Sequence, residues 1–412
     1  MFLARREVGA LLALAAGAFC FVAMETLPVG LLPLIATGFH VSLPNAGLLV
    51  TGYGLTVAIM SVPLAYATRR IPRRFLLSAV LGLFVLATLA SCLAPTYEAL
   101  LVARVVVALS QSVFWAVVGP AAASLFPVAA RGRAAATVFG GSALAPMLGV
   151  PAGTWLGQQA GWRAAFLALA GVGLVAFLLV ATLMPTRPVG QGHAATGTAP
   201  SALRYWLLVA ITILAVTGLF VAFTYTTPFL TEVTRFPAAA ISPVLLLRGV
   251  LDLAGTVAGG ILTDRHPNLV FVGSLALIVV SLIGAWTFAT SKPATAWLLG
   301  LSGFALGSVS PVLTHRVLEV APGSTDFAAA GTSAAFNVGI AGGSSAGGAV
   351  LILTGLRSTA LVGGVVVLVA LALAAFDAVA ARVRPPSSAA LAPDAAAGGN
   401  PARRRPTGGR LR

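Results

Sequence analysis

A carboxylate inside the first long apolar segment is the residue that points most directly to chemistry. Glu25 lies in a stretch from residue 8 to residue 31 that contains no other charged side chain. Placing a charged side chain at the centre of a membrane helix costs about 2.5 to 3.5 kcal/mol on insertion scales, so such residues face an interior cavity and mark ion or substrate pathways. Glu25 is therefore the first candidate for a group that carries a proton.

Further charged residues lie inside other apolar segments, and three of them are candidates for the proton path. We place Arg104 in the same half of the membrane as Glu25. The proton affinity of a buried carboxyl depends on how close a cation comes, so these two residues form a candidate proton switch. A purely structural contact between two helices is the alternative. Arg248 and Asp252 are four residues apart and can pair along one helix face. They are the second candidate for the proton path, or a structural pair whose charges neutralise locally.

Polar and aromatic residues on four of the apolar segments are candidates to contact a substrate. Sugar sites combine amide or hydroxyl partners with an aromatic plate, whereas sites for lipophilic drugs are mostly apolar. Asn337 is an amide in a segment, 327–353, that consists mostly of Gly and Ala, and it favours recognition of a polar substrate. Each candidate is equally compatible with ordinary helix packing. The candidates are Thr26, Gln111, Trp115, Phe223, Tyr225, Thr227 and Asn337.

The elements that must position these residues are membrane helices. Of 412 residues, 58% are hydrophobic and 8% are charged, a composition too apolar for a soluble domain. An apolar run of about 20 residues spans a bilayer, and the sequence contains twelve such runs. The predicted fold is an all-α polytopic membrane protein with spans at 8–31, 45–67, 75–94, 98–125, 134–157, 164–184, 205–230, 240–263, 269–289, 294–314, 327–353 and 358–381.

Basic residues concentrate on one side of these spans. The loops on one side carry only Arg163, Arg235, Lys292 and Arg357. This bias predicts that both termini are cytoplasmic. The net charge of +15 then reflects topology and contact with the anionic lipid bilayer. We expect no nucleic-acid partner, because the basic tail that would suggest one has no aromatic residues for stacking.

The chain contains an internal repeat. A shift of 195 residues superimposes helix-breaking residues without a gap. This register predicts two six-helix halves, 1–186 and 205–384, joined by a flexible cytoplasmic linker at 187–204 and followed by a disordered basic tail at 385–412. The superimposed pairs are Pro33 with Pro228, Gly54 with Gly249, Pro72 with Pro267, Pro127 with Pro322 and Gly153 with Gly348.

Small residues recur at every fourth position in one segment of each half. This spacing lines a helix face with side chains no larger than a methyl group, so two helices can approach closely. Static packing explains any single pair, but a five-position row in both halves favours an interface that stays tight while the halves rock. The rows are Gly141, Ala145, Gly149, Gly153 and Gly157, and Gly331, Ala335, Gly339, Gly343 and Gly347.

The sequence offers no motif for catalysis or for a cofactor. Its only lysine, Lys292, is followed by Pro293, so it has no phosphate-binding loop. The four histidines lack the HExxH spacing, and no GxSxG elbow occurs. We therefore expect no enzyme activity, no metal and no cofactor. Energy for any transport must come from an ion gradient or from the solute gradient itself.

Parallel six-helix halves are also how major facilitator transporters are built, with the substrate site between the halves. Residues 24–33, Met-Glu-Thr-Leu-Pro-Val-Gly-Leu-Leu-Pro, resemble the first-helix motif of the drug and sugar proton antiporters of that superfamily. Arg104, followed by Gln111, Phe114 and Trp115, resembles the fourth-helix motif, whose arginine is implied in proton coupling.

The loop after the second span resembles the signature loop of the superfamily, which implies gating roles for Arg70 and Arg74. The family pattern has an acidic residue before the first arginine, but this chain has Arg69 there. The corresponding loop of the second half keeps the acid in Asp264 and Arg265. The resemblance therefore implies a charge contact between the halves at Asp264 and puts the matching contact at Arg69 in doubt.

Residues 141–153 resemble the fifth-helix motif associated with antiporters, which implies gating roles for Gly149, Pro151 and Gly153. The chain looks most similar to the bacterial sugar-efflux branch, which exports arabinose and thiogalactosides. This similarity lies in residues 59–63, Ile-Met-Ser-Val-Pro, in the pair Phe114 and Trp115, and in residues 157–163, Gly-Gln-Gln-Ala-Gly-Trp-Arg. The resemblance covers nearly all of residues 8 to 384.

This resemblance implies a proton-coupled exporter of sugars or sugar-like small molecules that works by alternating access. A multidrug or chloramphenicol-type proton antiporter is the alternative. A non-transporting membrane sensor on the same fold is a further one, but no large soluble domain interrupts the spans. We expect a monomer in the bacterial inner membrane, with small-molecule substrate, protons and the bilayer as its partners.

Overall fold

The structure of the protein is a computed structural model that describes residues 2–127, 130–186, 199–323 and 325–383. Across these residues, twelve helices are long and apolar enough to cross a membrane, which confirms the predicted fold class. Most of the predicted linker at 187–204 and all of the predicted tail at 385–412 lie outside the described residues.

The first six spans are built from seven α-helices and one π-helical turn. They are α1 (Phe2–Phe39), α2 (Leu43–Thr68), α3 (Arg73–Leu93), α4 (Tyr97–Ser124), α5 (Arg131–Leu144), η2 (Ala145–Gly149), α6 (Val150–Ala160) and α7 (Trp162–Leu183). The fifth span consists of α5, η2 and α6, which are continuous in the chain.

The last six spans follow the same plan. They are α8 (Ala202–Phe223), followed by α9 (Thr226–Pro228) and η3 (Phe229–Val233), and then α10 (Ala238–Thr263), α11 (Pro267–Thr287), α12 (Lys292–Val320), α13 (Thr325–Thr354) and α14 (Ser358–Val383). We call α1–α7 the N-terminal half and α8–α14 the C-terminal half.

Two predicted spans differ from the observed helices for reasons that involve proline. Helix α1 continues to Phe39 although Pro28 and Pro33 lie inside it, because membrane helices tolerate proline when neighbouring groups satisfy the freed backbone atoms. The seventh predicted span, 205–230, is instead interrupted after Phe223. Pro228 has no N–H for the carbonyl four residues earlier, so the helix opens into a turn before α9.

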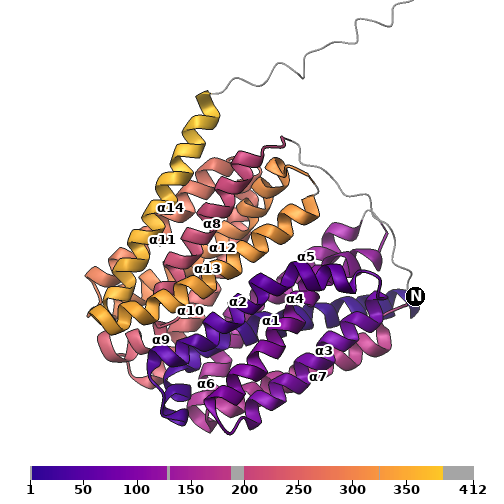
Figure 1. Cartoon of the computed structure of the whole chain (residues 1–412), viewed down its shortest axis with the longest axis horizontal. Coiled ribbons are helices and arrows are strands. Elements are labelled where there is room, and N and C mark those ends of the chain that lie inside the picture. The colour runs from indigo at the N-terminus through magenta and orange to yellow at the C-terminus, as the bar shows by residue number, and fades with distance from the viewer. Residues whose placement is uncertain (1, 128–129, 187–198, 324, 384–412) are drawn as a thin grey trace, which may run out of the picture.

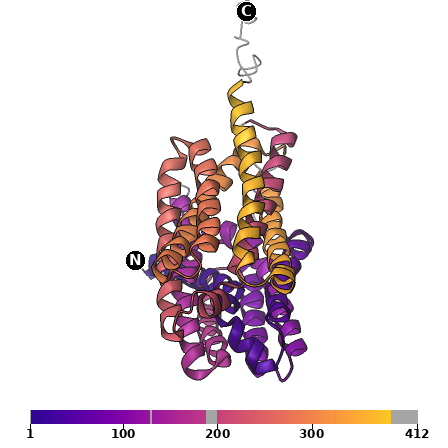
Figure 2. The same cartoon turned by 90° about the vertical axis from the view of Figure 1, so that its left-hand side faces the viewer.

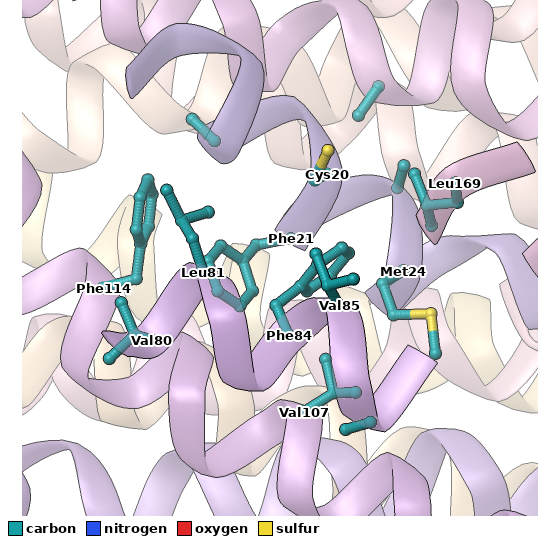
Figure 3. Close-up of a cluster of buried hydrophobic side chains, with 14 of the residues drawn as sticks. Cys20, Phe21, Met24, Val80, Leu81, Phe84, Val85, Val107, Phe114 and Leu169 are labelled. Carbon is teal, nitrogen blue, oxygen red and sulfur yellow. The ribbon is translucent and has the colours of Figure 1, made fainter. Parts of the chain in front are cut away.

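The two halves lie beside one another and each has its own hydrophobic core (Figures 1 and 2). In the N-terminal half the core centres on Phe21 of α1, whose ring centroid lies 4.9 Å from that of Phe84 on α3 and 4.7 Å from that of Phe114 on α4 (Figure 3). Edge-on and tilted aromatic contacts of this kind add to the energy of area burial. They fix α1 against α3 and α4.

The two predicted rows of small residues pack inside the halves rather than between them. A Cβ added to Gly149 would lie 3.1 Å from the side chains of Ala23 and Phe19, and one at Gly141 would overlap the backbone of Ala15, so the first row lies against α1. The second row lies against α8, where a Cβ at Gly339 would lie 2.6 Å from Val216. These rows hold the fifth span on the first and the eleventh on the seventh.

A third close contact joins α10 to α12 in the C-terminal half, and the sequence analysis missed it. Gly255 lies against the carbonyl of Phe304, and Gly307 lies against the carbonyl of Asp252. The signal was present, because Gly255 and Gly259 on α10 and Gly303 and Gly307 on α12 repeat the four-residue spacing. Apolar helix surfaces gain little by leaving lipid, so such backbone contacts supply the packing energy.

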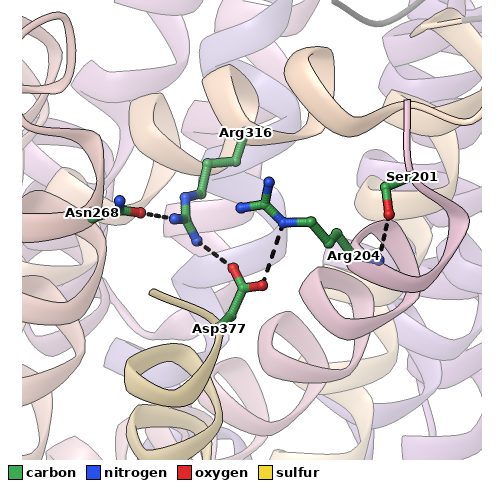
Figure 4. A network of polar contacts seen from close by, with 5 residues as sticks. All are labelled: Ser201, Arg204, Asn268, Arg316 and Asp377. Atoms are coloured by element: carbon green, nitrogen blue, oxygen red, sulfur yellow. Dashed lines mark hydrogen bonds and ion pairs between the residues drawn. The ribbon is translucent and has the colours of Figure 1, made fainter. Parts of the chain in front are cut away.

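Charged groups join the helix ends of the C-terminal half near the start of α8 (Figure 4). Asp377 of α14 lies between Arg204 of α8, at 3.4 Å, and Arg316 of α12, at 3.3 Å. Arg316 also donates a hydrogen bond to Asn268 of α11. One carboxylate therefore connects four helices through two arginines.

In the N-terminal half, an arginine joins the corresponding helix ends through a backbone carbonyl. Arg6 of α1 donates to the carbonyl of Thr182 on α7 at 3.0 Å. Thr182 and Asp377 are related by the repeat of 195 residues. The same position therefore receives an arginine from the first helix in each half, through a carbonyl in one and a carboxylate in the other.

Replacing Gly255 by Ala is expected to destabilise the protein, because the new methyl group would overlap the carbonyl of Phe304. Overpacking of this kind costs about 1 to 3 kcal/mol. Gly260 on the same helix has no atom within 4 Å of an added Cβ, so Gly260→Ala is the matched control. Thermal unfolding of both variants in detergent should show a lower Tm for Gly255→Ala alone. Equal Tm values would show that the α10–α12 contact is not close.

Candidate functional site

Glu25 takes part in a chain of three side chains from three helices. Gln111 of α4 donates a hydrogen bond from Nε2 to Oε2 of Glu25 at 3.0 Å. Tyr53 of α2 donates from its hydroxyl to Oε1 of the same amide at 2.6 Å. Because the tyrosine hydroxyl donates to the amide oxygen, the amide nitrogen is directed at Glu25. Gln111 and Tyr53 are buried, whereas Glu25 is partly exposed.

Arg104 lies next to this chain but binds backbone atoms. Its Nη1 donates to the carbonyl of Met24 at 3.1 Å, and its Nε donates to the carbonyl of Leu49 at 3.3 Å. The guanidinium also lies 5.0 Å from the ring centroid of Tyr53. In the described part of the chain it makes no ion pair within 4.0 Å with Glu25, so its charge acts on the carboxyl from a distance.

Proline explains why a carbonyl of α1 is available to Arg104. Pro28 has no backbone N–H, so the carbonyl of Met24, four residues earlier, loses its helical donor. An unpaired backbone carbonyl in the membrane interior is costly, and Arg104 supplies the missing donor. The sequence motif around Glu25 thus creates the acceptor that fixes the arginine one residue from the carboxylate.

The other predicted residues of the N-terminal half lie near Gln111 or Glu25. The hydroxyl of Thr26 donates to the carbonyl of Val22 in its own helix at 2.7 Å. Trp115, one turn beyond Gln111 on α4, is partly exposed and stacks on Phe139 of α5 with centroids 6.0 Å apart. Trp115 therefore presents an aromatic surface on the same helix as the Gln111 amide.

In the C-terminal half, Arg248 and Phe223 are brought together. The guanidinium of Arg248 lies 3.9 Å from the ring centroid of Phe223. No ion pair within 4.0 Å joins Arg248 to Asp252 among the described residues, so the predicted pairing along α10 is replaced by contact with the ring. Asn337 of α13 donates to the carbonyl of Ser333 at 3.0 Å, and its Oδ1 has no hydrogen-bond partner among the described residues.

Two predicted substrate contacts, Tyr225 and Thr227, lie instead where the halves touch. Thr227 donates to the carbonyl of Val29 on α1 at 2.8 Å. That carbonyl is again one that a proline frees, because Pro33 lies four residues later. Tyr225 is fully buried, and its hydroxyl donates to the carbonyl of Ser344 at 3.1 Å.

Further hydrogen bonds between the halves lie at the same end of the molecule, which we call the closed end. Each joins a side chain of one half to a backbone carbonyl of the other. They run from Ser344 to Gly47 at 2.9 Å, from Ser242 to Pro151 at 2.8 Å and from Gln158 to Ala238 at 3.0 Å. Close backbone contacts between the halves include those of Gly54 with Asn337 and of Gly249 with Pro146.

Toward the opposite end, where α1 begins and α14 ends, the two halves diverge (Figure 1). Large apolar side chains are exposed there on helices of both halves, including Ile59, Phe139 and Ile261. The loop residue Asp264 is exposed and makes no ion pair in the described part of the chain. The charge contact between halves that the resemblance implies at Asp264 is therefore not made in this state.

The remaining predicted gating residues lie in two places. The arginines lie toward this open end, and the glycines and proline lie in the fifth span, which packs against α1. Arg70 and Arg265 are exposed. Arg74 donates to the carbonyl of Ala181 at 2.6 Å, inside its own half. Gly149, Pro151 and Gly153 lie in the fifth span, where Gly149 and Gly153 pack against α1 and the carbonyl of Pro151 accepts the bond from Ser242.

Comparison with known proteins agrees with this architecture. The family model described as Major Facilitator Superfamily matches residues 14–325. The chain belongs to the major facilitator superfamily. It is therefore a multi-pass membrane transporter of small molecules and not an enzyme.

Two curated relatives of this major facilitator are similar over most of their length. The inner membrane transport protein YdhP of Escherichia coli is 34% identical over 343 residues, which are 83% of this chain and 88% of YdhP. A probable sugar efflux transporter of Mannheimia succiniciproducens is 32% identical over 364 residues, 88% of this chain and 91% of the relative.

Among solved structures, a bacterial homolog of the human lysosomal transporter Spinster, in an inward-facing and unoccupied conformation, has the same fold. The TM-score is 0.71 at 16% identity, over 90% of this chain and 96% of that protein.

Removing the Thr227 hydroxyl, which joins the halves at the closed end, should favour opening of that end. Thr227→Val would leave the carbonyl of Val29 without a donor, at a cost of about 1 to 3 kcal/mol. Spin labels at Leu93 and Ile352, both exposed, in a variant lacking Cys20 and Cys92, should report a larger population of long distances.

Thr231→Val is the matched control for this experiment. The hydroxyl of Thr231 donates only to carbonyls of its own segment, Thr227 and Pro228. Identical distance distributions in the two variants would contradict a role for the Thr227 bond in holding the closed end.

Proposed function

We propose that this transporter exports sugars or sugar-like molecules in exchange for protons that Glu25 carries. The observation that carries the proposal is the hydrogen-bonded chain from Tyr53 through Gln111 to Glu25, with Arg104 fixed on the adjacent carbonyl. The similarity to a probable sugar efflux transporter supports the choice of substrate class.

The geometry suggests how substrate and proton would compete. Glu25 is partly exposed, receives a hydrogen bond from Gln111 and makes no ion pair within 4.0 Å in the described residues. Its charge is thus balanced by the Gln111 amide and, from a distance, by Arg104. A substrate hydroxyl that bound the Gln111 amide would withdraw a donor from Glu25 and change its affinity for a proton. Loading substrate and releasing a proton would then be linked through a single amide.

The nature of the surrounding residues supports a polar substrate. The amides of Gln111 and Asn337 supply partners for hydroxyl groups, and Trp115 supplies an aromatic surface against which a sugar ring can pack. Lipophilic drugs would leave the unpaired Oδ1 of Asn337 without compensation.

The state of the structure fits the loading step of an exporter. The excess of basic residues supports a cytoplasmic position for the start of α1 and the end of α14 under the positive-inside rule. In this orientation the open end is cytoplasmic and the closed end faces outward. A substrate would enter from the cell interior in this state, and alternating access would follow when the halves rock.

Collapse of a pH gradient in inside-out vesicles tests both parts of the proposal. Arabinose and thiogalactosides are added in one series, and chloramphenicol and lipophilic cations in another. We expect proton movement on addition of the sugars only. A response to the drugs alone would assign the protein to multidrug export, and silence in both series would contradict proton-coupled export of these classes.

Glu25→Gln is expected to abolish uphill export, because the amide cannot carry a proton, while substrate binding stays measurable. Glu98→Gln, at the exposed first turn of α4, is the matched control and should transport as the wild type does. Binding is measured on purified protein and uphill transport in vesicles. Uphill export by Glu25→Gln would show that another group carries the proton.

A further inference from the structure

Arg248 is a buried cation with unused hydrogen-bond donors. The residue is 4% exposed, and its Nε and Nη2 have no hydrogen-bond partner in the described part of the chain. Its stem passes Gly303 of α12, where a Cβ would lie 2.9 Å from Cγ of Arg248. The proton pathway through Glu25 makes no use of it.

Such an arrangement is costly unless it serves a ligand. A buried donor without a partner costs about 1 to 3 kcal/mol, and more when the group is charged. Other buried arginines of this protein are better satisfied: Arg316 binds both Asp377 and Asn268, and Arg104 binds two backbone carbonyls. Arg248 is held mainly by the face of Phe223.

The two unused donors lie on one edge of the guanidinium. The Nε–H and one Nη2–H are parallel and form the fork that binds both oxygens of a carboxylate. The guanidinium lies over the ring of Phe223, which holds it in position. Both donors are unpaired among the described residues but buried in this state, so a planar anionic group reaches them only after the surrounding contact opens.

The position of the fork is at the contact between the halves. Phe223 belongs to a buried cluster that includes Val29 and Val50 of the N-terminal half and Ile340 of α13. Opening of that contact would uncover the ring and the guanidinium together. Asp252, one turn along α10, is partly exposed and close enough to interact electrostatically with Arg248.

The internal repeat relates this position to the proton site. A shift of 195 residues places Arg248 on Tyr53. Tyr53 in the N-terminal half donates to the amide that holds Glu25. The same position therefore bears a neutral donor in the half that holds the Glu25 site and a cation in the other half.

We propose that Arg248 binds a carboxylate of the substrate, so that the protein prefers sugar acids to neutral sugars. The inference rests on the proposed function and refines its substrate class. Asp252 lies near Arg248 when substrate is absent. The substrate carboxylate binds Nε and Nη2 of Arg248 once movement of the halves uncovers them. A single arginine with Asp252 nearby matches the single charge of a carboxylate better than the double charge of a phosphate ester.

Binding to the purified full-length protein tests this assignment. Glucuronate and gluconate are compared with glucose and with glucose 6-phosphate by calorimetry, in wild type, Arg248→Gln, Arg248→Lys and Arg235→Gln. Arg235 is exposed, so its variant removes one positive charge without touching the fork. Size-exclusion profiles confirm that each variant is folded.

We expect the wild type and Arg235→Gln to bind the sugar acids at least tenfold more tightly than glucose. Arg248→Gln should lose this preference, and Arg248→Lys should keep only part of it, because lysine retains the charge without the fork. Equal affinity of the wild type for acids and glucose, tighter binding of the phosphate ester, or an unchanged preference in Arg248→Gln would each overturn the inference.

The Glu25→Gln vesicle experiment separates this inference from the proposed function. Proton-coupled export of neutral sugars without acid preference would leave the proposed function intact and remove the carboxylate site. Binding of sugar acids through Arg248, with no dependence of transport on Glu25, would retain the carboxylate site and remove the proton assignment.

Discussion

Helix α1 carries two carbonyl oxygens that its own backbone cannot satisfy, and the rest of the site depends on how they are paired. Pro28 frees the carbonyl of Met24, and Pro33 frees that of Val29. Arg104 takes the first from within the N-terminal half, and Thr227 takes the second from across the interface. The requirement that backbone groups be satisfied in hydrocarbon thus places a cation beside Glu25 and fastens the two halves within a few residues of each other.

Glycine residues let the helices within each half pack closely against one another. Because lipid is as apolar as a leucine side chain, helices gain their packing energy from close backbone approach. The rows on the fifth and eleventh spans hold those spans against α1 and α8, the first helix of each half. These contacts hold the helices of each half together. Among the described residues, the side-chain hydrogen bonds between the halves lie at the closed end in this state.

Much of the fold could be predicted from hydropathy, because a membrane span leaves an uninterrupted apolar run. The boundaries at Phe39 and Phe223 could not, since whether proline breaks a helix depends on which partner takes the freed carbonyl. Glu25 and Gln111 were found as candidates from residue type alone, and the structure joins them.

Positions that depend on the path of neighbouring helices were harder to predict. Spacing suggested that Arg248 pairs with Asp252, but the guanidinium lies over Phe223, which is 25 residues away in the sequence. Tyr225 and Thr227 have the residue types of a sugar site, yet they lie at the contact between the halves. The carbonyl of Met24 could have been predicted as a partner of Arg104, because a proline four residues later leaves a helix carbonyl without its backbone donor.

The ring of Tyr225 lies in a tight contact between the halves. It fills a slot whose walls are Gly47 of one half and Gly348 of the other, where even a methyl group would collide with its hydroxyl. Opening of the closed end must withdraw Gly47 from the Tyr225 hydroxyl. A larger side chain at Gly47 would overlap this hydroxyl and so oppose closure.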